Sequence, residues 1–154
     1  MAADTLLTPE LLAFVGKPMW DAETSLVRES DILRYHEALG DTMIVRDTDG
    51  VLRAPPLFLP AFHHGGTIGE DGRRRKPGEF DLPVRVKRRL MAGCSVDFGV
   101  PIRAGDTITA TTTIESLTER QGSSGTMLLI VTATEYRNQR GELNRVERWT
   151  VIRR

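Results

Sequence analysis

The sequence predicts an α+β fold in which a curved antiparallel sheet is wrapped around one short central helix. Three observations predict it. Helical patterns come early in the chain, four long strand patterns follow residue 83, and a dense apolar segment stands between them. No repeat, low-complexity stretch or linker interrupts the 154 residues, so we expect residues 1–154 to form a single domain.

The N-terminal part carries two helix signals. Residues 8–16 offer a capping threonine, a proline at the first helical position and a glycine at the exit. Residues 23–28 follow as a candidate strand. The second helix is predicted over residues 31–39, with Ser30 as its cap and Gly40 as its end.

The central helix is predicted over residues 54–64. Its large apolar side chains fall at helical spacing and predict one buried face: Leu57, Phe58, Ala61 and Phe62. Prolines suit a first helical turn, and the glycine pair at 65–66 supplies an end. Pro60 removes an intrahelical hydrogen bond and should kink or shorten the element. The segment therefore predicts a short, bent and wholly buried helix.

The rest of the chain reads as a long loop, residues 65–82, followed by strands. An alternating segment at 84–87 is extended by 90–98, where Gly93 predicts a bulge or bend. Residues 107–117 and 145–152 are further strands. Residues 127–136 are apolar on both faces, which predicts a central strand covered on both sides.

Composition excludes several classes of function. Basic and acidic residues number 21 each, and no aromatic residues alternate with the basic ones, which argues against nucleic-acid binding. Three histidines and one cysteine are too few to predict a metal site. The single cysteine, Cys94, is expected to be a small buried side chain in a reducing compartment. Without a signal peptide or a membrane-length apolar run, we expect a cytoplasmic protein.

Four short motifs, taken in order, resemble those of one known family. They are Gly40-Asp41, Ala54-Pro55-Pro56, Pro101-Ile102-x-x-Gly105-Asp106 and Asn138-Gln139-x-Gly141-Glu142. Together they resemble the MaoC-like, hot-dog-fold dehydratases, above all the N-terminal, fatty-acid-synthase-type branch. The resemblance extends from about residue 8 to the end of the chain. It implies a hot-dog fold and R-specific hydration of trans-2-enoyl thioesters, or the reverse dehydration. Coenzyme A or acyl carrier protein would carry the substrate, and no cofactor is implied.

The chain departs from this family at two chemical positions. The family's active segment reads Asp-x-Asn-Pro-x-His. Here Asp41 is retained, but Arg46 stands where the histidine belongs. An arginine side chain does not deprotonate in a protein, so it cannot act as a general base. Pro55 and Pro56 lack N–H groups, so two donors that a helix N-terminus would offer to a thioester carbonyl are missing.

These departures resemble the family's non-catalytic subunits, which help to form the acyl tunnel beside a catalytic hot-dog partner. Mycobacterial hydroxyacyl-carrier-protein dehydratases are built in this way from unlike subunits. The leading hypothesis is therefore a subunit of an R-specific enoyl-thioester hydratase or 3-hydroxyacyl-thioester dehydratase, acting as the acyl-binding half of a homo- or heterodimer. The alternatives are a hydratase that is active alone, a non-enzymatic acyl-coenzyme A binder and, least favoured because of the prolines, a thioesterase.

Each candidate site residue has two readings. Asp41 is either an orienting carboxylate or a solvated loop residue, and Arg46 is either a surface cation or a phosphate or carboxylate contact. His63 and His64 either donate hydrogen bonds to the last carbonyls of the central helix, or one of them acts as the general base in place of the family's histidine.

The remaining candidates concern the substrate. Leu57, Phe58 and Phe62 are expected to line the acyl site. The basic run Arg73, Arg74 and Arg75 is either a solvated loop tip or an anchor for the phosphates of coenzyme A, with residues 87–89 as a rival anchor.

Overall fold

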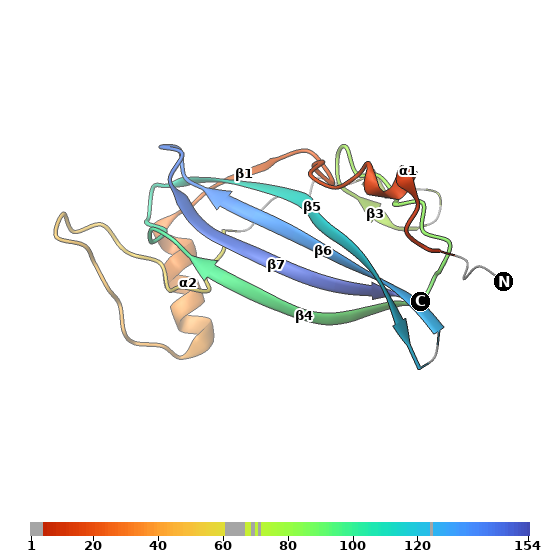
Figure 1. The fold of residues 1–154 in the computed structure, drawn as a ribbon. Helices are drawn as coiled ribbons and strands as arrows, with labels where there is room; N and C mark the ends of the chain where they lie inside the picture. The colour runs from red at the N-terminus through yellow and green to blue at the C-terminus, as the bar shows by residue number, and fades with distance from the viewer. Residues whose placement is uncertain (1–4, 61–66, 69, 71, 124) are drawn as a thin grey trace.

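The computed structural model describes residues 5–60, 67–68, 70, 72–123 and 125–154 (Figure 1). Its elements in chain order are α1 (Pro9–Leu12), β1 (Glu23–Leu26), α2 (Glu29–Leu39), β2 (Thr67–Ile68), β3 (Arg74–Arg75), β4 (Arg89–Phe98), β5 (Thr107–Gly122), β6 (Gly125–Arg137) and β7 (Leu143–Arg153). Five strands form one antiparallel sheet in the order β1-β5-β6-β7-β4, and β2 pairs only with β3. The sheet is long and curved, with α1 and α2 towards opposite ends (Figure 1).

The four long strands confirm the predicted β-rich second half. Buried residues alternate along the first half of β5, where threonines separate Ile108, Ala110 and Ile114. β6 lies between β5 and β7, as its two apolar faces predict. The register between β4 and β7 shifts between Met91 and Gly93, which confirms the predicted irregularity at Gly93.

Two strand-level predictions are wrong. Residues 84–87 form no strand. Val84 and the preceding Leu82 pack against the core cluster that contains Leu11 of α1. Cys94 is exposed and not buried. It lies on β4, which is an edge strand paired on one side only, so little covers its side chains.

The two early helices start near the predicted positions, but both predictions need a correction. α1 ends at Leu12, and residues 13–16 continue as turns and not as helix up to the predicted Gly16 exit. The Thr8 hydroxyl accepts a hydrogen bond from the Leu11 N–H at 3.2 Å and starts α1. α2 begins two residues earlier than a Ser30 cap predicts, with Arg28 in extended conformation at the N-cap position and no capping side chain. It ends at Gly40, whose φ of 64° is left-handed, as predicted.

The predicted helix over residues 54–64 is wrong for the part that the structure describes. Residues 54–60 make a single turn, closed by the Phe58 N–H donating to the Pro55 carbonyl at 2.9 Å, and then run without regular structure. The three prolines of this segment remove helical donors and disfavour helical dihedrals in the residues before them. The remaining residues of the prediction, 61–64, lie outside the described chain.

The core consists of two apolar clusters on the sheet. The first joins α2 and the segment around Phe58 to β5 and β6, and it contains Val27, Ile32, Leu52, Ala54, Phe58, Ile102, Ile108, Ala110 and Tyr136. The second places Leu11 of α1 on β5 and β6, with Ile114, Leu117, Leu128 and Ile130. Among the described residues, no helix is long and apolar enough to cross a lipid bilayer.

The N-terminal segment is fastened to β5 by one carboxylate and carries a testable pH dependence. Glu119 Oε2 accepts hydrogen bonds from the Thr5 hydroxyl at 2.9 Å and from the N–H groups of Leu6 and Leu7 at 2.6 and 3.0 Å. The bond from Thr5, followed by the backbone donors, holds the pKa of Glu119 below its usual 4.5.

A lowered folded-state pKa means that this fastening contributes stability above the unfolded pKa and loses it as the pH falls through the folded pKa. We expect Glu119→Gln to flatten the acid limb of a thermal-unfolding series taken from about pH 6 to about pH 3. The same acid slope in wild type and variant would contradict this assignment.

Candidate functional site

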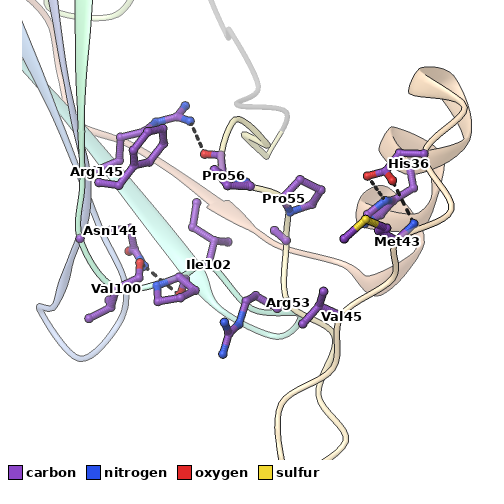
Figure 2. Close-up of a pocket in the computed structure, with 15 residues that line it drawn as sticks. His36, Met43, Val45, Arg53, Pro55, Pro56, Val100, Ile102, Asn144 and Arg145 are labelled. Carbon is purple, nitrogen blue, oxygen red and sulfur yellow. Dashed lines mark hydrogen bonds and ion pairs between the residues drawn. The ribbon is translucent and has the colours of Figure 1, made fainter.

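A cavity of about 570 Å³ lies where the end of α2, the segment 53–56, the turn after β4 and the start of β7 meet (Figure 2). Three of the four motifs that carry the family resemblance contribute to its wall, through Asp41, residues 54–56 and residues 101–102. The fourth motif, which contains Gln139, is hydrogen-bonded to the third, because Gln139 Nε2 donates to Asp106 Oδ1 at 3.2 Å. The motifs are therefore spatially linked around one cavity.

His36 and Asp41 form a hydrogen-bonded pair in this wall (Figure 2). The left-handed turn at Gly40 brings the chain back against the helix end, and the Asp41 N–H donates to the His36 carbonyl at 2.9 Å. His36 Nδ1 then lies 3.0 Å from Asp41 Oδ2, while Asp41 Oδ1 accepts the Met43 N–H at 2.9 Å. Both carboxylate oxygens of Asp41 therefore have a hydrogen-bond partner within the chain, although the side chain is still 37% exposed.

Sequence analysis did not single out His36, which lies within the predicted second helix, as a site residue. The side chain is only 4% exposed. Its Nε2 atom is buried and has no hydrogen-bond partner among the described residues. The available signal was the spacing: a histidine and an aspartate five residues apart on either side of a helix-ending glycine.

Arg46 lies outside the cavity wall. Its guanidinium donates to Glu29 Oε1 at 2.6 Å and to the Gly50 carbonyl at 2.9 Å, and both members of this ion pair are about half exposed. The hydrogen bond between them raises the pKa of Arg46 and lowers the pKa of Glu29. The arginine is thus a surface cation in a local ion pair, and it offers no proton acceptor.

The proline pair forms part of the wall and leaves it without backbone donors at residues 54–56. Pro55 and Pro56 have no N–H group, and the Ala54 N–H donates to the Ile102 carbonyl at 2.9 Å. The Pro56 carbonyl in turn accepts from Arg145 Nη1 at 3.1 Å. This segment therefore cannot polarise a thioester carbonyl through its own N–H groups.

Arg145 is the second site residue that the sequence did not reveal. It is 2% exposed, its Nη2 lies 2.7 Å from Glu147 Oε1, and its guanidinium lies 5.1 Å from the centre of the Tyr136 ring. Burial, followed by the negative charge of Glu147, raises the pKa of the Tyr136 phenol, which stays neutral. Arg145 thus ties β7 to the proline segment across the cavity.

A second cavity, of about 700 Å³, lies on the face of the sheet that residues 59–60 and 76–82 approach. Aromatic side chains line it, among them Trp20, Tyr136 and Trp149. At its rim Lys76 pairs with Glu23 at 2.5 Å and lies 4.4 Å from the centre of the Trp20 ring. Both cavities therefore combine an apolar wall with a few charged groups.

The other predicted site residues are placed as follows. Leu57 is 62% exposed and lines neither cavity, whereas Phe58 is buried and packs edge-on against Tyr35 with ring centres 5.6 Å apart. Arg73 is exposed, and Arg75 pairs with Asp81 at 2.9 Å. Arg74 belongs to β3, but its side chain lies outside what the structure describes, as do Phe62, His63 and His64. Across the described ranges, no group of three or more metal-ligating side chains occurs.

The comparisons with known proteins agree on the fold. The sequence profile of the FAS1-like dehydratase domain region matches residues 13–145. The ChsH1-ChsH2 complex from Mycobacterium tuberculosis contains a similar chain, with a TM-score of 0.63, 16% identity, and coverage of 94% of this chain and 86% of that one. A HadBC (3R-hydroxyacyl-ACP dehydratase) complex from the same organism also contains a similar chain. Its TM-score is 0.51 and its sequence identity 17%, with coverage of 90% of this chain and 99% of that one.

The R-hydratase PhaJ1 from Pseudomonas aeruginosa gives a TM-score of 0.51 and 14% identity, with coverage of 90% of this chain and 81% of that one. No curated protein sequence matches this chain. At these identities the structural comparisons show the fold, which is the hot-dog fold expected from the sequence.

Proposed function

Since this chain belongs to the FAS1-like dehydratase family of hot-dog proteins, we propose that it is a subunit of an R-specific enoyl-thioester hydratase or 3-hydroxyacyl-thioester dehydratase. It is the acyl-binding half, and a second hot-dog subunit supplies the histidine that activates water. The substrate is a thioester of coenzyme A or acyl carrier protein, and no cofactor takes part. A reducing cytoplasm suits a chain with one exposed cysteine.

One observation carries this proposal. The cavity retains the family's aspartate, Asp41, but the residue at the family's histidine position, Arg46, is held outside the wall by Glu29. A guanidinium has no lone pair with which to take a proton from water. Two further donors are missing at Pro55 and Pro56. Because the histidine of the family's active segment and the carbonyl donors at Pro55 and Pro56 are both missing from their expected positions, we propose that the bond-making groups come from another chain.

The open edge of the sheet offers a place for that chain. β4 pairs with β7 on one side only, and its other edge is unpaired in the sheet order (Figure 1). Met91 and Phe98 on this strand are 59% and 56% exposed. Unpaired edge strands with apolar side chains favour pairing with another strand. Two of the similar structures, ChsH1-ChsH2 and HadBC, are complexes of two named components.

The carrier phosphates require basic groups near the cavities. Arg73 and Arg75 lie on or beside the β2–β3 hairpin, and Arg89 lines the larger cavity. Guanidinium groups bind phosphate oxygens through paired hydrogen bonds. We propose that this basic region holds the phosphates of the carrier.

The test compares the pure chain with the assembled pair. We expect the pure chain to hydrate crotonyl-coenzyme A at least about 100-fold more slowly than a complex with a hot-dog subunit that carries the Asp-x-x-x-x-His segment, since a positioned general base contributes about that factor or more. Replacing that histidine in the partner should abolish the activity of the complex. Arg46→Lys in this chain is the matched control and should leave it unchanged.

Turnover by the pure chain at ordinary enzyme rates would contradict the proposal. In that case His63→Ala and His64→Ala would show whether either histidine is a displaced base. Saturable acyl-thioester binding with no activity in any assembly would identify the chain as a non-enzymatic binder instead.

A further inference from the structure

Basic side chains gather at the end of the sheet where β4 begins and β7 ends, which we call the cationic end. It lies beside the C-terminus and away from α2 (Figure 1). Backbone pairing brings five basic residues from two segments together here: Lys87, Arg88, Arg89, Arg153 and Arg154. The chain as a whole carries no net charge, so the cationic end concentrates positive charge in a balanced molecule.

Two consecutive cross-strand pairs at the cationic end join arginine to arginine. Arg89 of β4 lies opposite Arg153 of β7. One step further along, the Arg88 N–H donates to the Arg154 carbonyl at 3.1 Å, and the Arg154 N–H donates to the Arg88 carbonyl at 3.0 Å. Like charges directly opposite one another destabilise an antiparallel sheet. Two such pairs in succession therefore indicate a surface arranged for an anion and not for the stability of the sheet.

The inner pair, Arg89 and Arg153, forms one end of the larger cavity. Among the described residues, the Arg89 side chain has no hydrogen-bond or ion-pair partner. Arg153 Nη1 donates a long hydrogen bond of 3.4 Å to the Lys87 carbonyl, and its Nε is buried with no partner in the described chain. Burial, followed by the positive charge of Arg89, lowers the pKa of Arg153. Two guanidiniums placed in this way suit a shared phosphate.

The larger cavity leads away from the inner pair along the face of the sheet. Arg153 and Glu147 both line it and lie six residues apart on β7, so the cavity follows about 20 Å of that strand. Apolar and hydroxyl-bearing side chains line it between these two residues, among them Val151, Thr132 and Thr134. A phosphopantetheine arm has a phosphate at one end and amide groups along its length, so its groups match this order.

The outer pair, Arg88 and Arg154, does not line the cavity. Successive side chains on a strand point to opposite faces of the sheet, so the outer pair lies on the other face from the inner pair. Lys87 and Arg88 are exposed. A small phosphate ligand inside the cavity would leave these outer cations unpaired. An acidic protein surface around that phosphate would reach them, which favours a protein over a free cofactor as the ligand.

We propose that the cationic end docks an acidic acyl carrier protein. Arg89 and Arg153 hold the phosphate of its phosphopantetheine group, and Arg88 and Arg154 contact carboxylates of the protein around it. The inference rests on the proposed function, and it selects a carrier protein over free coenzyme A as the carrier of the acyl thioester. Exposed charges are screened beyond about 8 Å at physiological ionic strength, so this docking should weaken as salt is added.

Calorimetric titration of the chain with a bacterial holo-acyl carrier protein, and separately with coenzyme A, tests this choice. Both ligands carry the phosphopantetheine arm, but only the first has an acidic protein surface. We expect the carrier protein to bind about tenfold more tightly than coenzyme A at low salt, since each exposed charge pair contributes a factor of up to about five. The difference should shrink as the ionic strength rises.

Two variants separate the outer pair from the inner pair. Replacing both Arg88 and Arg154 by alanine should weaken carrier-protein binding about tenfold and leave coenzyme A binding unchanged. Arg89→Met should weaken the binding of both ligands about tenfold, because it removes one donor to the phosphate. Arg34→Ala, which removes an exposed charge on α2 at the other end of the sheet, should change neither.

These variants remove charges that repel one another, so we expect them to fold at least as stably as the wild type, which circular dichroism checks. No binding of the carrier protein, equal binding of coenzyme A, or full carrier binding by the double variant would overturn the docking assignment. Binding of phosphatidylglycerol vesicles that is lost in the same variants would also overturn it and would assign the surface to a membrane. Hydration of crotonyl-coenzyme A by the assembled pair tests the proposed function separately from all of these results.

Discussion

Arg145→Met is expected to lower the free energy of unfolding by about 3 kcal/mol, one of the two largest effects that we predict. The substitution leaves Glu147 as a partly buried carboxylate without its cation, which had lain 2.7 Å away. It also removes the donor to the Pro56 carbonyl and the guanidinium over the Tyr136 ring. Breaking one member of a buried pair costs more than the pair contributes, because the other charge stays desolvated.

A matched control lies three residues further along the same strand. Arg148 also pairs with two acids, Glu115 and Asp97, but in the open, where its side chain is 34% exposed. Exposed pairs contribute about 0–1 kcal/mol, so Arg148→Met should cost less than about 1 kcal/mol. Chemical denaturation of both variants gives the comparison. Equal losses for the two arginines would show that burial of the Arg145 pair is not what stabilises β7.

Gly99→Ala is the second substitution for which we expect a large loss, about 3 kcal/mol. A β-carbon at this position would collide with the carbonyl oxygen of Leu143, which is backbone and cannot rotate away. The Gly99 N–H donates to the Asn144 carbonyl at 2.9 Å and holds the segment after β4 close to the start of β7. Gly99 also lines the smaller cavity, so the variant should weaken acyl-thioester binding as well.

Gly93→Ala provides the control for that prediction. Gly93 lies on β4, the strand that ends just before Gly99, its φ is not left-handed, and a β-carbon there would meet open space. Its replacement should change the unfolding free energy by no more than about 0.5 kcal/mol. Thermal unfolding of the two variants tests the pair, and a harmless Gly99→Ala would mean that β4 and the start of β7 can separate at little cost.

The sheet was predictable because its determinants are local. Alternating threonines and apolar residues fix the faces of β5, and a two-sided apolar run places β6 at the centre of the sheet. The end of α2 followed from Gly40, whose left-handed φ few other residues adopt. Where the chain's own neighbours decide the conformation, the sequence pattern was sufficient.

The site depended on contacts between distant residues, and there the pattern was insufficient. The apolar spacing at residues 54–60 favoured a helix, but the prolines override that spacing and the segment is held by Ile102 and Arg145 instead. His36 meets the Asp41 carboxylate only because the left-handed turn at Gly40 brings the chain back against the helix. Nothing local marks Arg145 as buried, since its partners Glu147 and Tyr136 matter only once β6 and β7 pair.

The exposed Cys94 thiol on the edge strand β4 can be used to measure assembly by chemical labelling. Cys94 is the only cysteine in the chain, so a maleimide dye attaches to one position and no other. If a companion strand aligns along β4, it will shield that sulfur, and the labelling rate will fall in proportion to the fraction of chains engaged. Assembly can thus be titrated without introducing a tag.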